Sequence, residues 1–343
     1  MSNDKIIAFD FLRFFAIFSV IMLHSSASLF LELYPSYNWL VANFYESISR
    51  WNVSIFFMIS GALFLRKSKK LNLRRLYSKN IFHIVIVFFF WSIIYTVTES
   101  SNIYDFNATL NKILIGPHHF WFLKALVGLY IAIPIFKYVV SQKKFEKYFL
   151  LTTFILGIFI PSFIVTVGVF NKPFEQFLVG IYDKFNIQLI STYSFYFLIG
   201  HYLIEYPIKK LYRYILYTLG IISPFATMLT TYYVSIHNNA PFMPFYENYF
   251  ICTTLEALAI FNFVYNLYRS KQFDINFSQI SNKIMGIYII HVFIMNCFSN
   301  IGFYPTTFNP IFFIPIYSML VFVVSYGIIL VMQKIPFIKK CVL

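Results

Sequence analysis

Long apolar stretches of about twenty residues alternate with short polar connections along the whole 343-residue chain. A helix of about this length crosses the hydrocarbon core of a bilayer. The pattern therefore predicts an all-α, polytopic membrane helical bundle that occupies residues 1–343 as a single integral-membrane domain. The ten predicted spans are 6–31, 40–65, 77–98, 118–139, 148–168, 187–206, 214–236, 248–268, 284–303 and 310–333.

The positive charges are distributed unevenly between the two sets of connections. When the N-terminus is placed in the cytoplasm, 20 of the 27 Lys and Arg residues fall in cytoplasmic segments. The opposite connections hold only Lys112, Lys172 and Lys184. Because cytoplasmic loops are enriched in Lys and Arg, this asymmetry predicts cytoplasmic N- and C-termini.

The composition is that of a membrane protein, since 59% of the residues are hydrophobic, only 12% are charged and the mean hydropathy is +0.70. The net charge of +14 mostly reflects topology, and without a soluble basic domain we expect no nucleic-acid partner. Cys252, Cys297 and Cys341 form no motif, so we expect no disulfide framework and no metal site. We expect no cleavable signal peptide, because residues 1–5 lead directly into the first span.

The first predicted span carries three ionisable residues, Asp10, Arg13 and His24, in an otherwise apolar run. Such groups are costly at this depth and usually face a bundle interior or a watery cavity, where they mark a functional site. Arg13 and His24 are eleven residues apart, so they share one helix face about 16.5 Å apart along the axis. Asp10 lies one turn before Arg13, close enough to bind its guanidinium.

The predicted topology divides the polar residues of the spans into two groups by depth. The outer group is His24, Arg50, His119 and Trp121, and the inner group is Arg13, Ser60 and His291.

Most of these residues also have a purely structural interpretation. Arg50 could extend to the outer headgroups as an anchor, and His119 and Trp121 could be ordinary interfacial residues. His24 and His291 could each bind a neighbouring helix and fix its packing. We weigh function above packing only for His24, because it shares its helix with Arg13 and Asp10.

Two further features lie toward the predicted cytoplasmic side. His201 and Glu205 are one turn apart and are interpreted as a simple helical pair. The basic run from Arg66 to Lys79 has the composition of a topogenic loop that contacts anionic lipid. The same charge would suit a phosphate-rich cytosolic cofactor, and composition alone does not choose between them.

Four sequence blocks, in order along the chain, contain the candidate residues. They are Asp10-x-Leu12-Arg13 followed by ten residues and His24; Ser49-Arg50-Trp-Asn-Val-Ser-Ile-Phe-Phe57-Met58-Ile-Ser60-Gly61; His119-Phe-Trp121-Phe122-Leu with Leu129-Tyr-Ile-Ala-Ile-Pro134; and Met285-Gly286-Ile-Tyr288-Ile-Ile-His291. Taken together, the blocks resemble the acyltransferase-3 family of polytopic membrane acyltransferases over essentially the whole chain. The length most resembles its stand-alone members, such as the enterobacterial common antigen O-acetyltransferase.

The resemblance implies an acyltransferase of the bacterial inner (cytoplasmic) membrane. Such an enzyme transfers an acyl group, usually acetyl from cytosolic acetyl-CoA, to a hydroxyl of a cell-envelope polysaccharide or its lipid-linked precursor. Family members often carry an Arg-x-x-Arg pair entering the third span, whereas this chain reads Lys79-Asn80-Ile-Phe-His83 there. We therefore expect Arg74, Arg75 and Lys79 to meet the CoA phosphates.

The implied chemistry gives each polar residue a role. His24 would act as a general base near neutral pH or become transiently acylated. Arg13, oriented by Asp10, would stabilise charge on the donor side, and Arg50 or His119 would orient the acceptor.

The alternative from another class is a transporter or exporter of envelope glycan precursors, in which the buried charges form a substrate or proton path. A structural membrane subunit would leave Arg13 and His24 without a role. The sequence specifies neither the acceptor nor the oligomeric state.

Overall fold

The computed structural model describes residues 3–30, 36–68, 70–99, 105–185, 192–270 and 277–336, and every regular element in these ranges is helical. In chain order the elements are α1 (Asn3–Phe30), α2 (Tyr37–Ser49), α3 (Asn52–Phe64), α4 (Leu73–Arg75), η1 (Leu76–Ile81), α5 (Phe82–Glu99), α6 (Phe106–Ile115), η2 (His118–Phe120), α7 (Trp121–Ile131), α8 (Ile133–Ser141), α9 (Lys143–Phe154), η3 (Ile155–Phe159), α10 (Ile160–Phe170), α11 (Lys172–Lys184), α12 (Thr192–Glu205), α13 (Lys210–Asn238), η5 (Pro244–Tyr246), α14 (Ile251–Arg269), α15 (Ser278–Ser281), α16 (Ile284–Asn300) and α17 (Pro310–Met332).

Six of the described helical segments are long and apolar enough to cross a membrane. They are Ile7–Phe30, Leu73–Thr98, Lys143–Phe170, Lys210–Asn238, Pro244–Arg269 and Pro310–Met332. A seventh span results if α7 and α8, which meet at a bend of 56°, are taken together. The all-helical, multi-pass class is thus confirmed for the described chain, whereas the count of ten spans is not. The orientation of the termini stays a prediction.

The predicted span 40–65 is not one continuous helix. It consists of α2 and α3, each of 13 residues, separated at Arg50 and Trp51. Nearby side chains bind carbonyls at the end of α2: Asn52 Nδ2 donates to the Ser49 oxygen at 2.6 Å, and Trp51 Nε1 donates to the Ile48 oxygen at 2.9 Å. A break of this kind is tolerated within an apolar stretch where protein groups satisfy the freed backbone.

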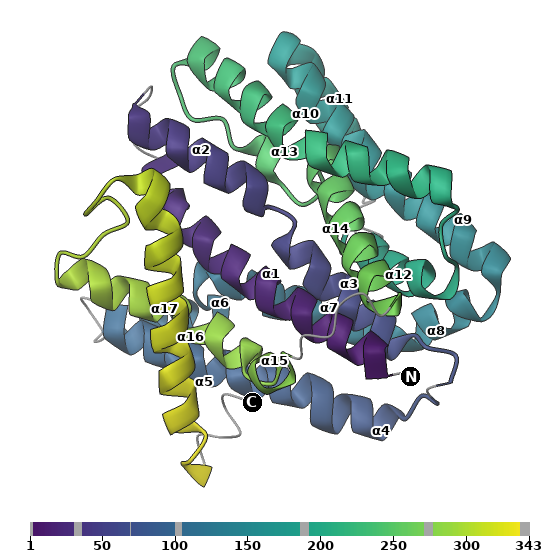
Figure 1. Ribbon diagram of the computed structural model, residues 1–343, viewed down its shortest axis with the longest axis horizontal. Coiled ribbons are helices and arrows are strands. Elements are labelled where there is room, and N and C mark those ends of the chain that lie inside the picture. The colour runs from purple at the N-terminus through teal and green to yellow at the C-terminus, as the bar shows by residue number, and fades with distance from the viewer. Residues whose placement is uncertain are drawn as a thin grey trace.

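Helix α1 lies at the centre of the bundle. It packs against α2, α3, α14, α15, α16 and α17, and in Figure 1 it runs diagonally through the middle of the molecule with α17 crossing beside it. Ala8, Ala16 and Ile17 on α1 are fully buried. Asp10, Ser19, Ser25 and Ser26 on the same helix are also buried, so these polar residues face protein, as expected inside a membrane.

Helices α3 and α12 approach each other closely through glycine. A Cβ placed on Gly61 would collide with the Phe197 carbonyl, and one on Gly200 would collide with the Met58 carbonyl. Small residues allow such close backbone contact in membrane bundles. This contact fixes the position of α3, and with it Ser60, relative to the rest of the bundle.

Candidate active site

Arg13 is held on one side by α1 itself and by α15. Its Nη1 donates to Asp10 Oδ1 at 3.1 Å and to Ser281 Oγ at 3.2 Å, while Ser281 Oγ donates to the same Asp10 oxygen at 2.6 Å. The expected Asp10–Arg13 contact is therefore present. Ser281, which sequence reasoning missed, completes a three-membered polar cluster that orients the guanidinium.

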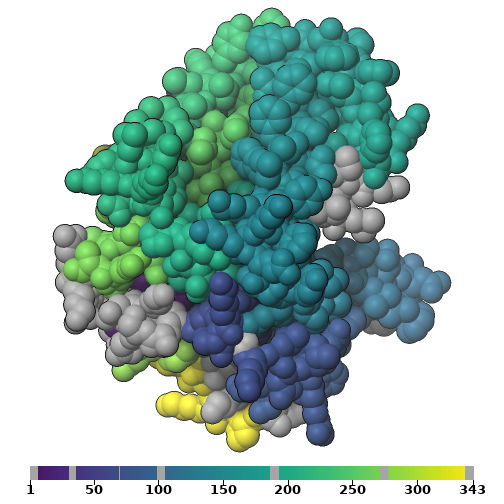
Figure 2. Space-filling view, turned by 90° about the vertical axis from the view of Figure 1, so that its right-hand side faces the viewer, coloured from purple at the N-terminus to yellow at the C-terminus, as the bar shows by residue number. Residues whose placement is uncertain are grey.

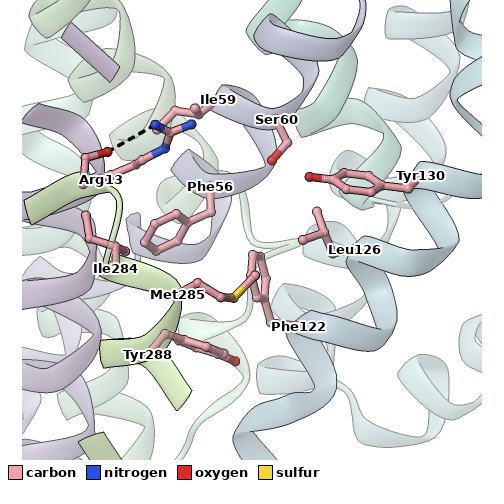
Figure 3. Close-up of a pocket in the computed structure, with 11 residues that line it drawn as sticks. Arg13, Phe56, Ile59, Ser60, Phe122, Leu126, Tyr130, Ile284, Met285 and Tyr288 are labelled. Carbon is pink, nitrogen blue, oxygen red and sulfur yellow. Dashed lines mark hydrogen bonds between the residues drawn. The ribbon is translucent and has the colours of Figure 1, made fainter. Parts of the chain in front are cut away.

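The other side of Arg13 borders a cavity of about 190 Å³, which we call the Arg13 cavity. Figure 3 shows Ser60 and Tyr130 directing their hydroxyl groups toward one another across this space. The described residues that line it are Arg13, Phe56, Ile59, Ser60, Phe122, Leu126, Tyr130, Ser281, Ile284, Met285 and Tyr288. Arg13 and Ser60 thus share one space, as their assignment to one depth group predicts.

Three imidazoles from three different helical segments meet beyond the Tyr288 side of this cavity. The ring centre of His24 lies 5.2 Å from that of His291 and 6.4 Å from that of His119, and the latter two are 5.5 Å apart. His119 and His291 are buried, whereas His24 is half-buried. We call these residues the histidine cluster.

The histidine cluster corrects one prediction. We assigned His291 to the inner group with Arg13 and Ser60, but its ring lies against His24 and His119. The inner position would follow only if each apolar stretch crossed the membrane as a full span. Helix α16 has only 17 residues, and it brings His291 to the level of His24.

Tyr288 connects the Arg13 cavity to the histidine cluster. It lines the cavity, its hydroxyl donates to the His119 carbonyl, and its own carbonyl faces His291 Nδ1 at 2.6 Å. Tyr95 on α5 adds a second support, because its hydroxyl donates to the Ile289 carbonyl at 2.9 Å and accepts from the Phe293 amide at 3.0 Å. The two tyrosines were not among the predicted site residues, although Tyr288 lies within the last sequence block.

Arg50 is part of a polar network and is not a free membrane anchor. It pairs with Glu46, and its guanidinium carbon lies 4.6 Å from the centre of the Tyr246 ring. Glu46 is fully buried and also accepts from Ser26 Oγ at 3.1 Å, which ties α2 to α1 two residues after His24. Arg50 Nε is buried without a hydrogen-bond partner among the described residues. The spacing of four residues between Glu46 and Arg50 was the available signal for this pair.

Trp121 does not join the histidine cluster. Its half-buried ring stacks on Tyr193 of α12, with ring centres 5.5 Å apart, and packs edge-on against Phe122. The structure therefore places Trp121 in the aromatic packing between α7 and α12.

The three predicted CoA ligands occupy different positions. Arg75 lines a second cavity of about 260 Å³, together with Lys70 and with Lys137 of α8. Arg74 and Lys79 are exposed but do not line it. The indigo atoms of residues 70–80 lie in the lower part of the surface in Figure 2. We call this second space the basic cavity.

The basic cavity and the Arg13 cavity are adjacent. Phe64 lines the former and Tyr130 lines the latter, and the centres of their rings are 4.7 Å apart. Ser60 and Phe64 lie one turn apart on α3, so the two spaces follow the same helix. The two aromatic rings form part of the wall between the cavities.

The interpretation of His201 and Glu205 as a helical pair is wrong. His201 Nδ1 lies 2.7 Å from Glu146 Oε1 on α9, and both side chains are almost completely buried. His201 pairs with Glu146 on another helix because a buried imidazole needs a polar partner.

Among the residues that the structure describes, no group of three or more His, Cys, Asp or Glu side chains could hold a metal ion. Two imidazole nitrogens of the histidine cluster instead face backbone carbonyls: Nδ1 of His291 faces Tyr288, and Nε2 of His119 faces Ile289 at 3.5 Å. The chemistry that this arrangement supports is proton transfer by imidazole.

The comparisons with known proteins identify the family. A family model described as an acyltransferase domain matches residues 6–330, which is nearly the whole chain. The comparisons with curated proteins and with solved structures gave no match. The four sequence blocks all lie within the matched residues, and the resemblance to the family is thereby confirmed. The chain belongs to the acyltransferase-3 family of membrane acyltransferases.

Proposed function

We propose that this protein is an acetyl-CoA-dependent O-acetyltransferase of the bacterial cytoplasmic membrane. Its acceptor would be a hydroxyl of a cell-envelope glycan or of the lipid-linked precursor of that glycan. The observation that carries the proposal is the arrangement of the site. Arg13 lies at one end of the Arg13 cavity and Tyr288 at the other, and the histidine cluster lies beyond Tyr288.

In the proposed reaction, His24 takes the proton of the acceptor hydroxyl as its oxygen attacks the thioester carbonyl. The carbon–sulfur bond then breaks, CoA leaves as a thiolate, and the proton on His24 passes to that sulfur. The products are an ester and free CoA. A sugar hydroxyl is a poor nucleophile at neutral pH, so a positioned base increases the rate. His24 suits this role because it is the half-buried member of the cluster and can meet a substrate.

The geometry separates the roles of the two arginines. Arg13 lies about 16.5 Å from His24 along α1, too far for both to contact the same reacting atom. Arg13 is therefore suited to polar groups of the donor's arm. Arg50 is better placed relative to the base, because its partner Glu46 binds Ser26, two residues after His24 on α1, and its Nε donor is unoccupied among the described residues. Arg50 is thus the better candidate to stabilise the oxyanion.

The two cavities support a route for the donor. The described lining of the basic cavity includes three cations, Lys70, Arg75 and Lys137, which suit the phosphates of a nucleotide. The long arm of CoA would extend from there past Phe64 and Tyr130 into the Arg13 cavity and toward Tyr288.

The test is transfer of labelled acetyl from acetyl-CoA into a glycan or lipid fraction by the purified protein in vesicles. We expect His24→Ala to abolish transfer because it removes the base. His237→Ala is the matched control, because this exposed histidine lies at the end of α13 and far along the chain from the site blocks. Absence of transfer by the wild-type protein, or normal transfer by His24→Ala, would refute the assignment. A transporter would instead move the glycan precursor without acetyl-CoA.

A further inference from the structure

The hydrogen bonding of His291 indicates which of its ring nitrogens carries the proton. Nδ1 lies 2.6 Å from the Tyr288 carbonyl oxygen, and a carbonyl oxygen only accepts. Nδ1 is therefore the donor, and in the neutral ring Nε2 keeps a lone pair. Nε2 is buried and has no hydrogen-bond partner among the described residues. A buried acceptor without a partner is unfavourable, so a hydrogen-bond donor to Nε2 would stabilise the site.

His119 is the wrong partner for that lone pair, although its ring is only 5.5 Å away. Its Nε2 faces the Ile289 carbonyl oxygen at 3.5 Å, which places the proton on Nε2. The remaining nitrogen of a neutral His119 then carries a lone pair as well. Two lone pairs cannot form a hydrogen bond.

His24 has the freedom that His119 lacks. It has no hydrogen-bond partner among the described residues, it is half-buried, and its ring centre lies 5.2 Å from that of His291. At this separation, two ring nitrogens that face each other would be about 3 Å apart, which is the length of a hydrogen bond. A side-chain rotation of His24 that turns a ring N–H toward His291 Nε2 would form this bond.

We infer that His291 is a positioning residue that accepts a hydrogen bond from His24 through Nε2. The bond holds the His24 ring in one tautomer, with the lone pair of its other nitrogen directed toward the accessible side of the cluster. A base oriented by a third group is a recurring arrangement in acyl-transfer sites. Here the third group is a neutral imidazole, which is less costly to bury than a carboxylate. The inference rests on the proposed function, in which His24 is the base.

Two substitutions of similar size separate the two nitrogens of His291. In His291→Gln, the side-chain amide reaches the position of Nε2 and can still accept from His24. In His291→Asn, the shorter amide reaches only the position of Nδ1, so it can bind the Tyr288 carbonyl but offers His24 no acceptor. If both variants merely disturb packing, the two should behave alike.

The measurement is the rate at which diethyl pyrocarbonate modifies His24 in the purified full-length protein, followed by peptide mass spectrometry. This reagent attacks the imidazole lone pair, and the exposed His237 serves as the internal reference in each sample. We expect the rate for His24, relative to His237, to fall about tenfold in His291→Asn and to stay near the wild-type value in His291→Gln. Acetyl transfer should follow the same order in kcat, with the KM for acetyl-CoA unchanged.

Equal modification of His24 in the wild type and in His291→Asn would overturn the inference. A parallel loss of kcat in both variants with unchanged His24 reactivity would also overturn it, since only packing would then be involved. The reactivity readout does not require acyl transfer. If the wild-type protein transfers no acetyl, the proposed function fails, while the modification rates still decide whether His291 holds His24.

Discussion

Arg13 uses its Nη1 atom to bind Asp10 and Ser281, which leaves the remainder of its guanidinium beside the Arg13 cavity. A lysine at this position would keep the charge, but its single nitrogen cannot occupy both the Nη1 position beside Asp10 and Ser281 and the positions of the other guanidinium nitrogens. We expect Arg13→Lys to lower kcat/KM for acetyl-CoA about ten- to a hundredfold, as for one lost charge-assisted hydrogen bond. Arg269→Lys, at an exposed arginine, is the control. Steady-state kinetics on quantified protein provide the test, and an unchanged value would mean that only charge matters at position 13.

At the scale of elements, the segment before α5 divides its cations between the basic cavity and the open surface. Arg75 and Lys70 line the cavity, whereas Arg74 and Lys79 do not. We expect the double substitution Arg75→Gln and Lys70→Gln to raise the KM for acetyl-CoA about tenfold or more. Screening at the surface keeps the increase toward the lower end of this range. The KM for the acceptor should not change.

The double substitution Arg74→Gln and Lys79→Gln is the matched control, because it removes the same charge from the same segment. It should leave the KM for acetyl-CoA near the wild-type value. An equal rise in both double variants would indicate a general effect of charge, and no rise in either would remove this segment from the donor site.

At the scale of the whole molecule, the distribution of Lys and Arg predicts which connections face the cytoplasm. We expect single cysteines at Ser68 and Lys144 to be protected from an impermeant maleimide in intact cells, and those at Asn107 and Gln176 to be labelled. All four positions are exposed in the structure. The native cysteines are first replaced by serine. Labelling of Ser68→Cys from outside would show that the topology is the reverse of the predicted one. The basic cavity would then lie on the side without cytosolic CoA.

The local parts of this architecture could be predicted from the sequence, and the long-range parts could not. The contact of Asp10 with Arg13 follows from helical spacing within one apolar run, and the structure has it. The meeting of His24 with His291 joins segments far apart in the chain, and no periodicity encodes it. The same holds for His201, whose partner Glu146 lies on another helix rather than one turn away. The break at Arg50 was missed because α2 and α3 together have the apolar length of one span.

The ring pair of Phe64 and Tyr130 between the two cavities has a consequence for leakage. A protein that admits a thioester from the cytosol while exposing an imidazole to another compartment risks a continuous file of water through the bilayer. Such a file would conduct protons along the membrane potential and would let water compete with the acceptor for the acetyl group. Two rings packed together, here tilted by 49° with their centres 4.7 Å apart, would exclude water until a ligand's arm displaces them. The same contact that interrupts the donor's route would therefore keep the membrane electrically sealed between turnovers.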